Sequence, residues 1–596
     1  MLLHEKLIFD AVSKYVSEKY TIPQSDINLV FQQTRKEFEG DITLVIFGLT
    51  KLLKKSPPQV GDEMTALLKE IIFEGQPLLK GTQLVQGFLN ISLSDAYWLW
   101  SLRTHSLNLP ATGKKTVVEY SSPNTNKPLH LGHIRNNLLG DSVSRIIEAA
   151  GDELVKVQII NDRGIHICKS MLAWQKFGKG ESPESSGLKG DHLVGKYYVA
   201  YDKAYRADVA ALLAAGMAEA EAKAKAPILL EAQEMLRKWE AGDTEIIALW
   251  EKMNSWVYAG FNATYSRLGV SFDKNYYESQ TYLLGKDKVL QGLQQGVFFQ
   301  KEDGSVWADL SAEKLDQKVV LRSDGTSVYM TQDIGTAIER YNEWQMDNMI
   351  YVVGNEQDYH FKVLFHILQK LGYDWAQRCF HLSYGMVDLP SGKMKSREGT
   401  VVDADDLIEE VVAGARQKTL ELGKFDALSE AAAADLFEQI GLGALKYFIL
   451  KVDPQKRMLF NPDESIDLNG NTGPFIQYSH ARICSILRKA EARGIPLTQR
   501  HAVNASELVA AERELIILLT AYKQVVLEAR QKLSPAVICQ YAYDLATAFN
   551  RFYHDCSILN EAQAETQAFR LSLAAHTAEV LKRSLHLIGV AAPEKM

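Results

Sequence analysis

Hydrophobic and polar positions alternate with different periods in different parts of this chain. Between residues 116 and 390, short apolar runs typical of strands alternate with longer stretches of helical periodicity. This alternation predicts an α/β fold, in which helices cover both faces of a doubly wound, Rossmann-like parallel sheet. The main strand candidates are residues 116–120, 155–160, 349–354 and 380–389.

The pattern differs on either side of that region. The first hundred residues mix helical and strand-like segments, which predicts a separate α+β domain, and the C-terminal part has helical periodicity with few strand signals. Inside the α/β region, a stretch rich in Ala, Glu and Lys predicts a helical insertion whose charges form a solvated face. We expect an N-terminal domain at 1–108, a catalytic domain at 109–400 with an insertion at about 200–255, a connecting stem at 401–465 and an all-helical domain at 466–596.

Composition narrows the class of protein. A chain of 596 residues is too long for one core, and no apolar run approaches the ~20 residues that a membrane helix needs. Five cysteines lie far apart without a CxxC pair, so we expect neither a metal site nor disulfides. Charged and polar residues interrupt the first ten positions, and we expect a cytoplasmic protein. The formal net charge of -8 says little about partners, because binding depends on where basic residues cluster.

The segment YSSPNTNKPLHLGHIR, residues 120–135, carries the most specific chemistry. It joins a strand to a polar loop, and we expect a helix to start near Pro128, because proline is favoured in the first helical turn. His130 and His133 would then lie on one helix face, where both imidazoles reach one phosphate. Gly132 lets a nucleotide approach the backbone, and the helix N-terminus attracts anions. The segment therefore predicts a nucleotide-activating site.

The HxGH pattern resembles the first signature of class I aminoacyl-tRNA synthetases and of related nucleotidyltransferases. With Asn124, Lys127 and Arg135 in place, the segment resembles the arginyl-tRNA synthetase version of that motif. The resemblance implies ATP, L-arginine and tRNA(Arg) as partners, with arginyl-adenylate as the intermediate and the 3′-terminal adenosine of the tRNA as acceptor. His130 and His133 would stabilise charge on the reacting phosphate. Mg²⁺ would accompany ATP without a dedicated protein site.

A second basic segment, SGKMKSREGT at residues 391–400, resembles the KMSKS loop of the class. It departs from that pattern, because a lysine replaces the first serine and a serine replaces the second lysine. In the arginyl family a lysine before the HxGH motif supplies the missing charge, and Lys127 occupies that position; Lys395 or Arg397 are alternatives. The resemblance implies catalytic roles for Lys393, Lys395 and Arg397, and ATP contacts for Gly132, Met394 and Ser396.

The resemblance also implies an arginine-binding site. A guanidinium requires carboxylates that accept paired hydrogen bonds, and Asp333 and Glu278 match the two acidic residues of the family. The remaining matches to residues that hold arginine are Asn124, Tyr329 and Gln357, and His360 is a candidate to support either this site or the nucleotide.

The outer domains fit the same resemblance. The N-terminal domain resembles the one that contacts the tRNA elbow in this family, with a dimerisation or packing module as the alternative. Segments 471–490 and 544–559 resemble the anticodon-binding domain. Their aromatic residues suit base stacking, although helical spacing is equally typical of core positions. These residues are Phe475, Tyr478, Phe549 and Phe552.

Three other functions remain open from the sequence. They are a class I synthetase for another amino acid, a small nucleotidyltransferase, and an inactive tRNA-binding paralogue. We expect a monomer. The resemblance further suggests that arginine activation requires bound tRNA.

Overall fold

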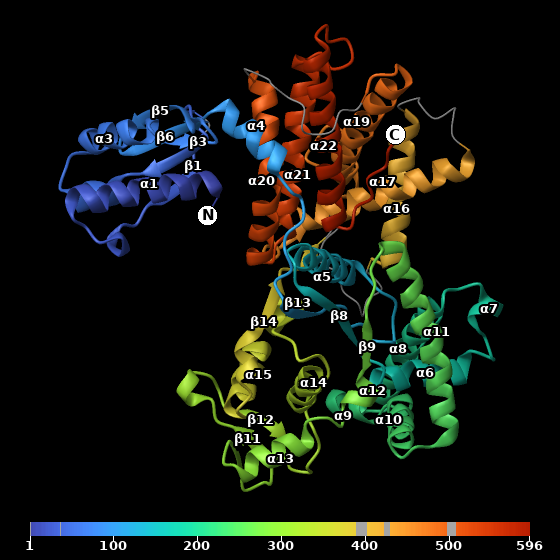
Figure 1. Cartoon of the computed structure of the whole chain (residues 1–596). Coiled ribbons are helices and arrows are strands. Elements are labelled where there is room, and N and C mark those ends of the chain that lie inside the picture. Colours follow the sequence, from blue (N-terminus) through green and yellow to red (C-terminus); the bar gives the residue numbers. More distant parts are fainter. Residues whose placement is uncertain (1, 36, 389–401, 422–428, 497–507) are drawn as a thin grey trace. The chain divides into compact units, whose positions relative to one another are not determined.

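The computed structural model describes the chain except for residues 1, 36, 389–401, 422–428 and 497–507 (Figure 1). The fold consists of two compact units. The first unit comprises Met1–Leu107, Ile483–Lys523 and Asp544–Val580. The second comprises Asn108–Arg482, Gln524–Tyr543 and Leu581–Met596.

The first unit begins with an α+β module. Its sheet has four antiparallel strands in the order β1-β2-β6-β5, packed with α1 and α3 through apolar residues that are fully buried, such as Ile8, Leu44 and Met64. The elements are α1 (Leu3–Tyr20), β1 (Val30–Gln33), β2 (Ile42–Val45), α2 (Phe47–Leu53), α3 (Pro57–Lys69), β3 (Ile72–Phe73), β4 (Gln76–Pro77), β5 (Leu79–Val85), β6 (Phe88–Leu93) and α4 (Asp95–Thr104).

The second unit is built on a five-stranded parallel sheet in the order β14-β13-β7-β8-β9. The strands are β7 (Lys115–Glu119), β8 (Glu153–Ile160), β9 (Lys274–Tyr277), β13 (Asn348–Gly354) and β14 (Cys379–Tyr384). Val117 and Val118 of β7 are both fully buried although they face opposite sides, which explains why the sequence shows a continuous apolar run here. The predicted doubly wound sheet is confirmed.

The sheet order places a switch point between β7 and β13. From β7 the chain proceeds to β8 and β9 on one side, and it later returns through β13 and β14 on the other. In open α/β sheets, ligands bind beyond the carboxyl ends of the strands at such a point. The helices that flank it are α5 (Leu131–Ala149), α14 (Tyr329–Trp344) and α15 (Asp358–Lys370).

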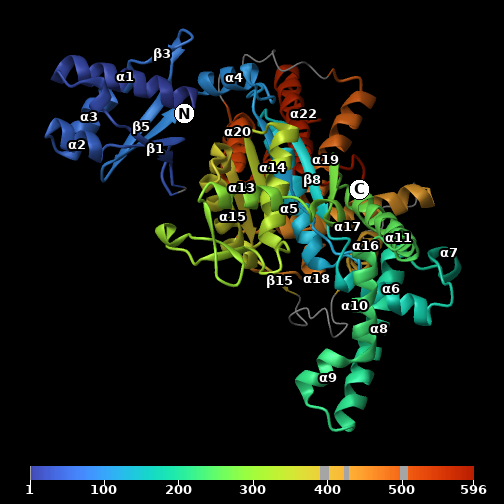
Figure 2. The ribbon, with the colours of Figure 1, turned by 90° about the horizontal axis from the view of Figure 1, so that it is seen from below.

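Helices dominate the stretch between β8 and β9. Figure 2 shows α8 leading away from the sheet towards α9. The helical stretch expected at about 200–255 is wider in the structure, because α8 starts before it and α11 continues beyond it. The helices are α6 (Ile165–Phe177), α7 (Pro183–Ser186), α8 (Gly190–Ala214), α9 (Glu219–Lys225), α10 (Pro227–Glu240) and α11 (Thr244–Leu268).

Two short helices and a small sheet connect β9 to α14. The three strands of that sheet are antiparallel, in the order β10-β11-β12, and their apolar residues join the core beneath the parallel sheet. The elements are α12 (Glu278–Thr281), α13 (Lys286–Gln294), β10 (Phe298–Gln300), β11 (Val306–Ala308) and β12 (Lys318–Leu321).

The C-terminal part is almost entirely helical, as predicted. Phe549 and Phe552 are both 0 % exposed, so they are core residues and cannot stack on RNA bases in this structure. In the described part of the chain, no helix has the length and apolar character needed to cross a membrane. The elements are β15 (Val387–Asp388), α16 (Ala404–Glu421), α17 (Glu430–Leu450), β16 (Met458–Leu459), α18 (Pro462–Ser465), α19 (Gly473–Ala492), α20 (Ala510–Lys532), α21 (Pro535–Asp555) and α22 (Ala564–Leu587).

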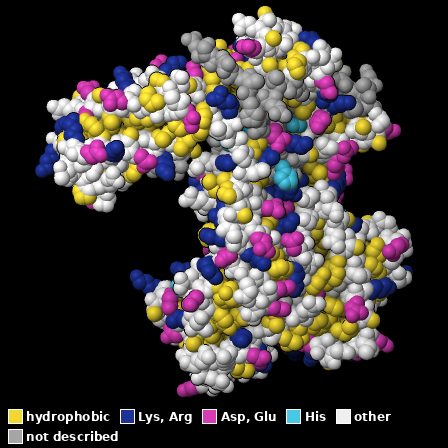
Figure 3. All heavy atoms as spheres, in the orientation of Figure 1, with side chains coloured by type: hydrophobic (Ala, Val, Ile, Leu, Met, Phe, Trp, Pro, Cys, Tyr) yellow, Lys and Arg dark blue, Asp and Glu magenta, His cyan; other side chains and the backbone are white. Residues whose placement is uncertain are grey.

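The surface carries both signs of charge. On the face shown in Figure 3, acidic and basic side chains are interspersed among the described residues. This mixture agrees with the modest net charge of the chain.

The end of α22 and the segment that follows it are anchored to the second unit by side chains. Ser142 of α5 donates to the carbonyl of Leu587 at 2.8 Å, Lys446 of α17 to that of Gly589 at 2.6 Å, and Gln477 of α19 to that of Ala591 at 2.9 Å. Because Ser142 lies on the helix that begins at the HxGH motif, residues 587–591 support the back of that helix.

Helix α5 packs directly on the end of β7 because Gly140 has no side chain. A Cβ atom at this position would lie 2.2 Å from Cγ of Tyr120. We predict that Gly140→Ala lowers the free energy of unfolding by about 1–3 kcal/mol, the usual cost of overpacking a core, despite the better helix propensity of alanine. Urea denaturation measures this difference. Gly48→Ala in α2 is the matched control, since its Cβ would make only an ordinary 3.5 Å contact, and it should not destabilise the protein.

The buried Lys446 predicts a specific dependence of stability on pH. Burial lowers the pKa of its ammonium group to about 8 from the ordinary 10.5. Between these values the unfolded chain binds more protons than the folded one, so the contribution of Lys446 to stability rises with pH across this window. We predict that wild type gains stability relative to Lys446→Met between pH 8 and 10.5, as measured by urea denaturation. A constant difference across that range would contradict this.

Candidate functional site

The start of α5 is closed by a reciprocal pair of hydrogen bonds that involve the two motif histidines. His130 is the N-cap, with extended backbone angles, and its Nδ1 accepts from the backbone N–H of Gly132 at 3.1 Å. The backbone N–H of His130 donates to Nδ1 of His133 at 3.1 Å. The prediction that the helix starts near Pro128 was therefore wrong by three residues, because an imidazole acts here as the capping acceptor.

These hydrogen bonds fix the state of both imidazoles. Burial lowers the pKa of His130 to about 4 and that of His133 well below its ordinary value, with a further contribution from the charge of Lys127. Both rings are therefore neutral at pH 7. Since Nδ1 of each ring accepts a hydrogen bond, the proton of each ring lies on Nε2. The two rings are 3.9 Å apart between centroids, so the cap presents two adjacent N–H donors.

Two further residues of α5 tie the motif to the switch point. The buried Arg135 donates to the carbonyls of Met386, Pro454 and Lys456. Asn136 accepts from the backbone N–H of Ser121 at 2.6 Å and donates to the carbonyl of Val352 at 2.7 Å, which joins the ends of β7 and β13. Arg135 of the motif is thus a structural residue, and Asn136 is one whose importance the sequence did not indicate.

A pocket of about 410 Å³ lies beside the cap. One wall is the loop from Asn124 to His130, and the other is α8 between His192 and Val199. Burial lowers the pKa of Lys127, which lines this pocket together with His130. Asn124 is exposed on the same wall, where its backbone pairs with Asn161. The N-terminal part of α8, which precedes the insertion expected at about 200–255, thus contributes directly to the pocket, and the sequence did not predict this.

The acidic residues matched to arginine binding come together in space. Asp333 lies on the second turn of α14, and its Oδ2 is 2.6 Å from Nε2 of His360. Glu278, the first residue of α12, hydrogen-bonds the side chain of Gln332, the neighbour of Asp333. Burial raises the pKa of Glu278, and the charge of Asp333 adds to this effect. The two carboxylates therefore share one local electrostatic environment.

A cation lies near this acidic pair. Arg163, just after β8, stacks 3.8 Å from the ring centroid of Tyr282, and its charge opposes the rise in the pKa of Glu278. The neighbouring Asp162 accepts hydrogen bonds from Ser279, and burial raises its pKa. These residues fix the start of α12, which carries Glu278.

The other predicted contacts differ in their positions. Tyr329 is the first residue of α14 and is 75 % exposed, and Gln357 is exposed between β13 and α15. Neither side chain forms a hydrogen bond or an ion pair with another described residue. The residues of the KMSKS-like loop fall outside the described part of the chain: Lys393, Met394, Lys395, Ser396 and Arg397.

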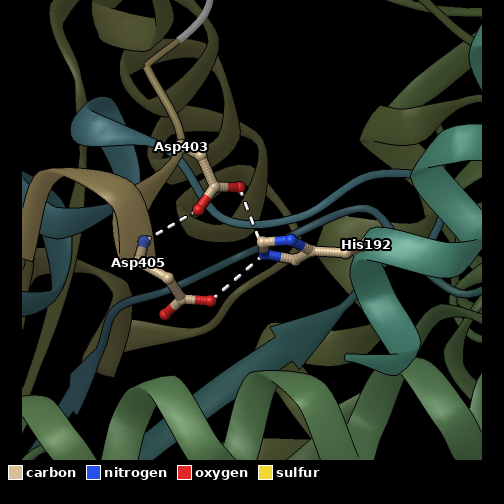
Figure 4. Close-up of side chains that lie close together, drawn as sticks. All are labelled: His192, Asp403 and Asp405. Atoms are coloured by element: carbon tan, nitrogen blue, oxygen red, sulfur yellow. Dashed lines mark hydrogen bonds and ion pairs between the residues drawn. The ribbon is translucent and has the colours of Figure 1, made fainter. Parts of the chain in front are cut away.

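A charged cluster adjoins the pocket (Figure 4), formed by His192 of α8 and the acidic residues Asp403 and Asp405 at the start of α16. Hydrogen bonds to Asp403 and Asp405 raise the pKa of His192 to about 10, so its imidazole is protonated at pH 7 and cannot ligate a metal ion. Lys189 forms an ion pair with Asp405 as well. The geometry could hold a cation, but the two basic side chains already balance these carboxylates, and the cluster joins α8 to α16.

Comparisons with known proteins agree with this architecture. Residues 102–461 match the family model "tRNA synthetases class I (R), catalytic domain", and residues 476–596 match "DALR anticodon binding domain". The chain is 53 % identical over 604 residues to an arginine–tRNA ligase of Bacteroides fragilis, with 100 % of both chains covered. It is 54 % identical over 584 residues to that of Flavobacterium psychrophilum, with 95 % and 96 % covered.

A solved structure gives the same result in three dimensions. The arginyl-tRNA synthetase of Thermus thermophilus superposes with a TM-score of 0.81 at 26 % sequence identity, with 100 % of both chains covered. Sequence and structure agree over the full length, including the N-terminal module and the helical C-terminal part. The chain therefore belongs to the arginyl family of class I aminoacyl-tRNA synthetases.

Proposed function

We propose that this protein is an arginine–tRNA ligase. It activates L-arginine with ATP to form arginyl-adenylate and transfers arginine to the 3′-terminal adenosine of tRNA(Arg). The observation that carries the proposal is the full-length match to arginine–tRNA ligases. The clustering of Asp333 and Glu278 beside the sheet that carries the HxGH cap supports it.

In the first step a carboxylate oxygen of arginine attacks the α-phosphorus of ATP, and the bond to the pyrophosphate oxygen breaks. Charge accumulates on the phosphate oxygens, and the Nε2–H groups of His130 and His133 would donate to them. Each well-aimed donor of this kind contributes roughly 3 kcal/mol to transition-state stabilisation. Lys127 adds positive charge at the same end of α5, where the helix N-terminus also favours an anion. Mg²⁺ bound to ATP would shield its phosphates.

In the second step a ribose hydroxyl of the terminal adenosine attacks the carbonyl carbon of arginyl-adenylate, and AMP leaves. The class I resemblance indicates the 2′-hydroxyl. The pocket between the Asn124–His130 loop and α8 opens beside the HxGH cap and is large enough to admit part of a nucleotide. By the same resemblance, we propose that bound tRNA is required before arginine is activated, and that the protein acts as a cytoplasmic monomer.

Arginine would be selected by its planar guanidinium. Asp333 and Glu278 offer two carboxylates to this fork, and lysine would leave part of their hydrogen-bonding capacity unsatisfied. His360 holds one oxygen of Asp333 and so orients the carboxylate. Asn124, Tyr329 and Gln357 are proposed to contact the amino and carboxylate groups of the substrate.

Aminoacylation of a total tRNA pool with each of the twenty amino acids tests the proposal directly. We expect arginine alone to be attached, because only its side chain satisfies both carboxylates. Attachment of another amino acid in preference would favour a different synthetase. Binding of tRNA without any attachment would favour an inactive paralogue.

Replacing the proposed guanidinium acceptor tests the assignment of the arginine site. We predict that Asp333→Asn raises the KM for arginine by about 10- to 100-fold, since a hydrogen bond to a charged group contributes about 1.5–3 kcal/mol. The affinity for tRNA should change little, because Asp333 is proposed to contact the guanidinium of arginine and not the tRNA. Steady-state aminoacylation and a tRNA-binding assay measure the two effects.

A matched control separates this effect from a general loss of charge. Asp374 is an exposed acidic residue of the same unit, and Asp374→Asn should leave both measurements unchanged. An equal loss of arginine activation and of tRNA affinity in Asp333→Asn would contradict the assigned role.

A further inference from the structure

A buried ion pair joins the parallel sheet to α14, the helix that carries Asp333. Glu119, the last residue of β7, pairs with Arg340 of α14, and the two side chains are only 7 % and 2 % exposed. β7 leads directly into the loop that carries the HxGH motif, whereas α14 carries Asp333. The ion pair thus joins the two elements that hold the proposed ATP and arginine contacts.

Arg340 is held by more than its ion pair. Its guanidinium carbon lies 4.7 Å from the ring centroid of Tyr276 and 5.9 Å from that of Tyr351. Tyr276 precedes Glu278 by two residues. Burial acts to lower the pKa of Arg340, but the nearby Glu119 carboxylate acts to raise it, and the net effect is a raised pKa. This guanidinium therefore stays charged inside the protein.

Arg340 has unused hydrogen-bonding capacity. Its Nε and Nη2 atoms are buried and have no hydrogen-bond partner among the described residues. Arg340 follows Asp333 by seven residues, close to two full turns, so both lie on one face of α14. Helical side chains lean towards the N-terminus of their helix, so Arg340 extends over the preceding turn, in the direction of Asp333 along α14. The charge of Asp333 also acts on Glu119, after the larger effects of burial and of Arg340.

A buried arginine therefore lies on the same helix as Asp333, which is proposed to bind free arginine. The buried residue and the proposed substrate carry the same guanidinium group. Without Glu119, the acidic residues of α14 would be left to attract Arg340: Asp333, and Glu343, whose pKa the charge of Arg340 already helps to lower. A guanidinium supplied by the protein itself would then compete with the substrate for Asp333.

We propose that Glu119 is a specificity-determining positioning residue, which sequesters Arg340 and so leaves Asp333 and Glu278 free for the guanidinium of the substrate. This inference rests on the proposed function and deepens it. It assigns a role to an ion pair that touches neither ATP nor arginine.

The test removes first the partner and then the competitor. We predict that Glu119→Gln raises the KM for arginine about tenfold, the order expected when a charged hydrogen bond is weakened, and changes the KM for ATP less than about twofold. Adding Arg340→Met should return the KM for arginine to within about threefold of wild type, because the competing cation is gone and a neutral pair of similar volume is tolerated. Steady-state aminoacylation with the full-length protein and tRNA(Arg) measures these constants.

Two further variants keep the test decisive. Glu119→Asp retains the charge but moves the carboxylate away from Arg340 by one methylene group, so it should raise the KM for arginine by a smaller factor. This variant replaces Glu119→Gln if that one does not fold. Glu438→Gln breaks a partly buried pair with Arg267 in the same unit, outside the proposed site. It should lower the thermal unfolding midpoint without changing the KM for arginine.

A purely structural role would give a different result. The inference is overturned if Glu119→Gln, or Glu119→Asp in its place, leaves the KM for arginine unchanged or raises the KM for ATP equally. It is also overturned if the double variant is worse than the single one. Failure of wild type to attach arginine would instead refute the proposed function, so the two failures are distinguishable.

Discussion

The geometry of the proposed nucleotide site depends on the reciprocal cap at the start of α5. An imidazole nitrogen replaces the usual hydroxyl or carboxylate acceptor of an N-cap. The same hydrogen bonds that cap the start of the helix also hold both rings in one tautomer. Burial keeps these rings uncharged, so each imidazole carries one N–H group, which points in a fixed direction. Asn136 fixes this helix to the ends of two strands. The same few contacts therefore satisfy the backbone N–H groups at the helix start and fix the orientation of the two imidazoles that we propose act on ATP.

Charge is distributed differently around the two proposed substrate sites. Near the cap, the neutral imidazole of His130 and the partly buried Lys127 line the pocket. Near α14, carboxylates dominate, and each is attached to a neighbour: Asp333 to His360 and Glu278 to Gln332. Both carboxylates are partly exposed, and these contacts hold each of them in a defined position before any ligand arrives. Such preorganisation lowers the entropy that a bound substrate would have to lose.

The sequence predicted the elements better than the contacts between them. Apolar runs such as 155–160 identified strands because burial on both faces leaves a continuous hydrophobic signal, and the segment with the HxGH motif predicted the start of α5 to within three residues. The N-cap position was missed because histidine is not a usual capping residue. The pairs Glu119–Arg340 and His192–Asp405 could not be predicted, since their partners are 221 and 213 residues apart and no periodicity links them.

The anchoring of residues 587–591 also has a consequence for biosynthesis. Ser142 and Leu587 are separated by 445 positions, so the ribosome must make nearly all of the intervening chain before this contact can form. Until then the back of α5 lacks partners that it has in the finished protein, and contacts of such high sequence separation form slowly. The nascent catalytic unit would thus wait for a late segment before reaching its final packing.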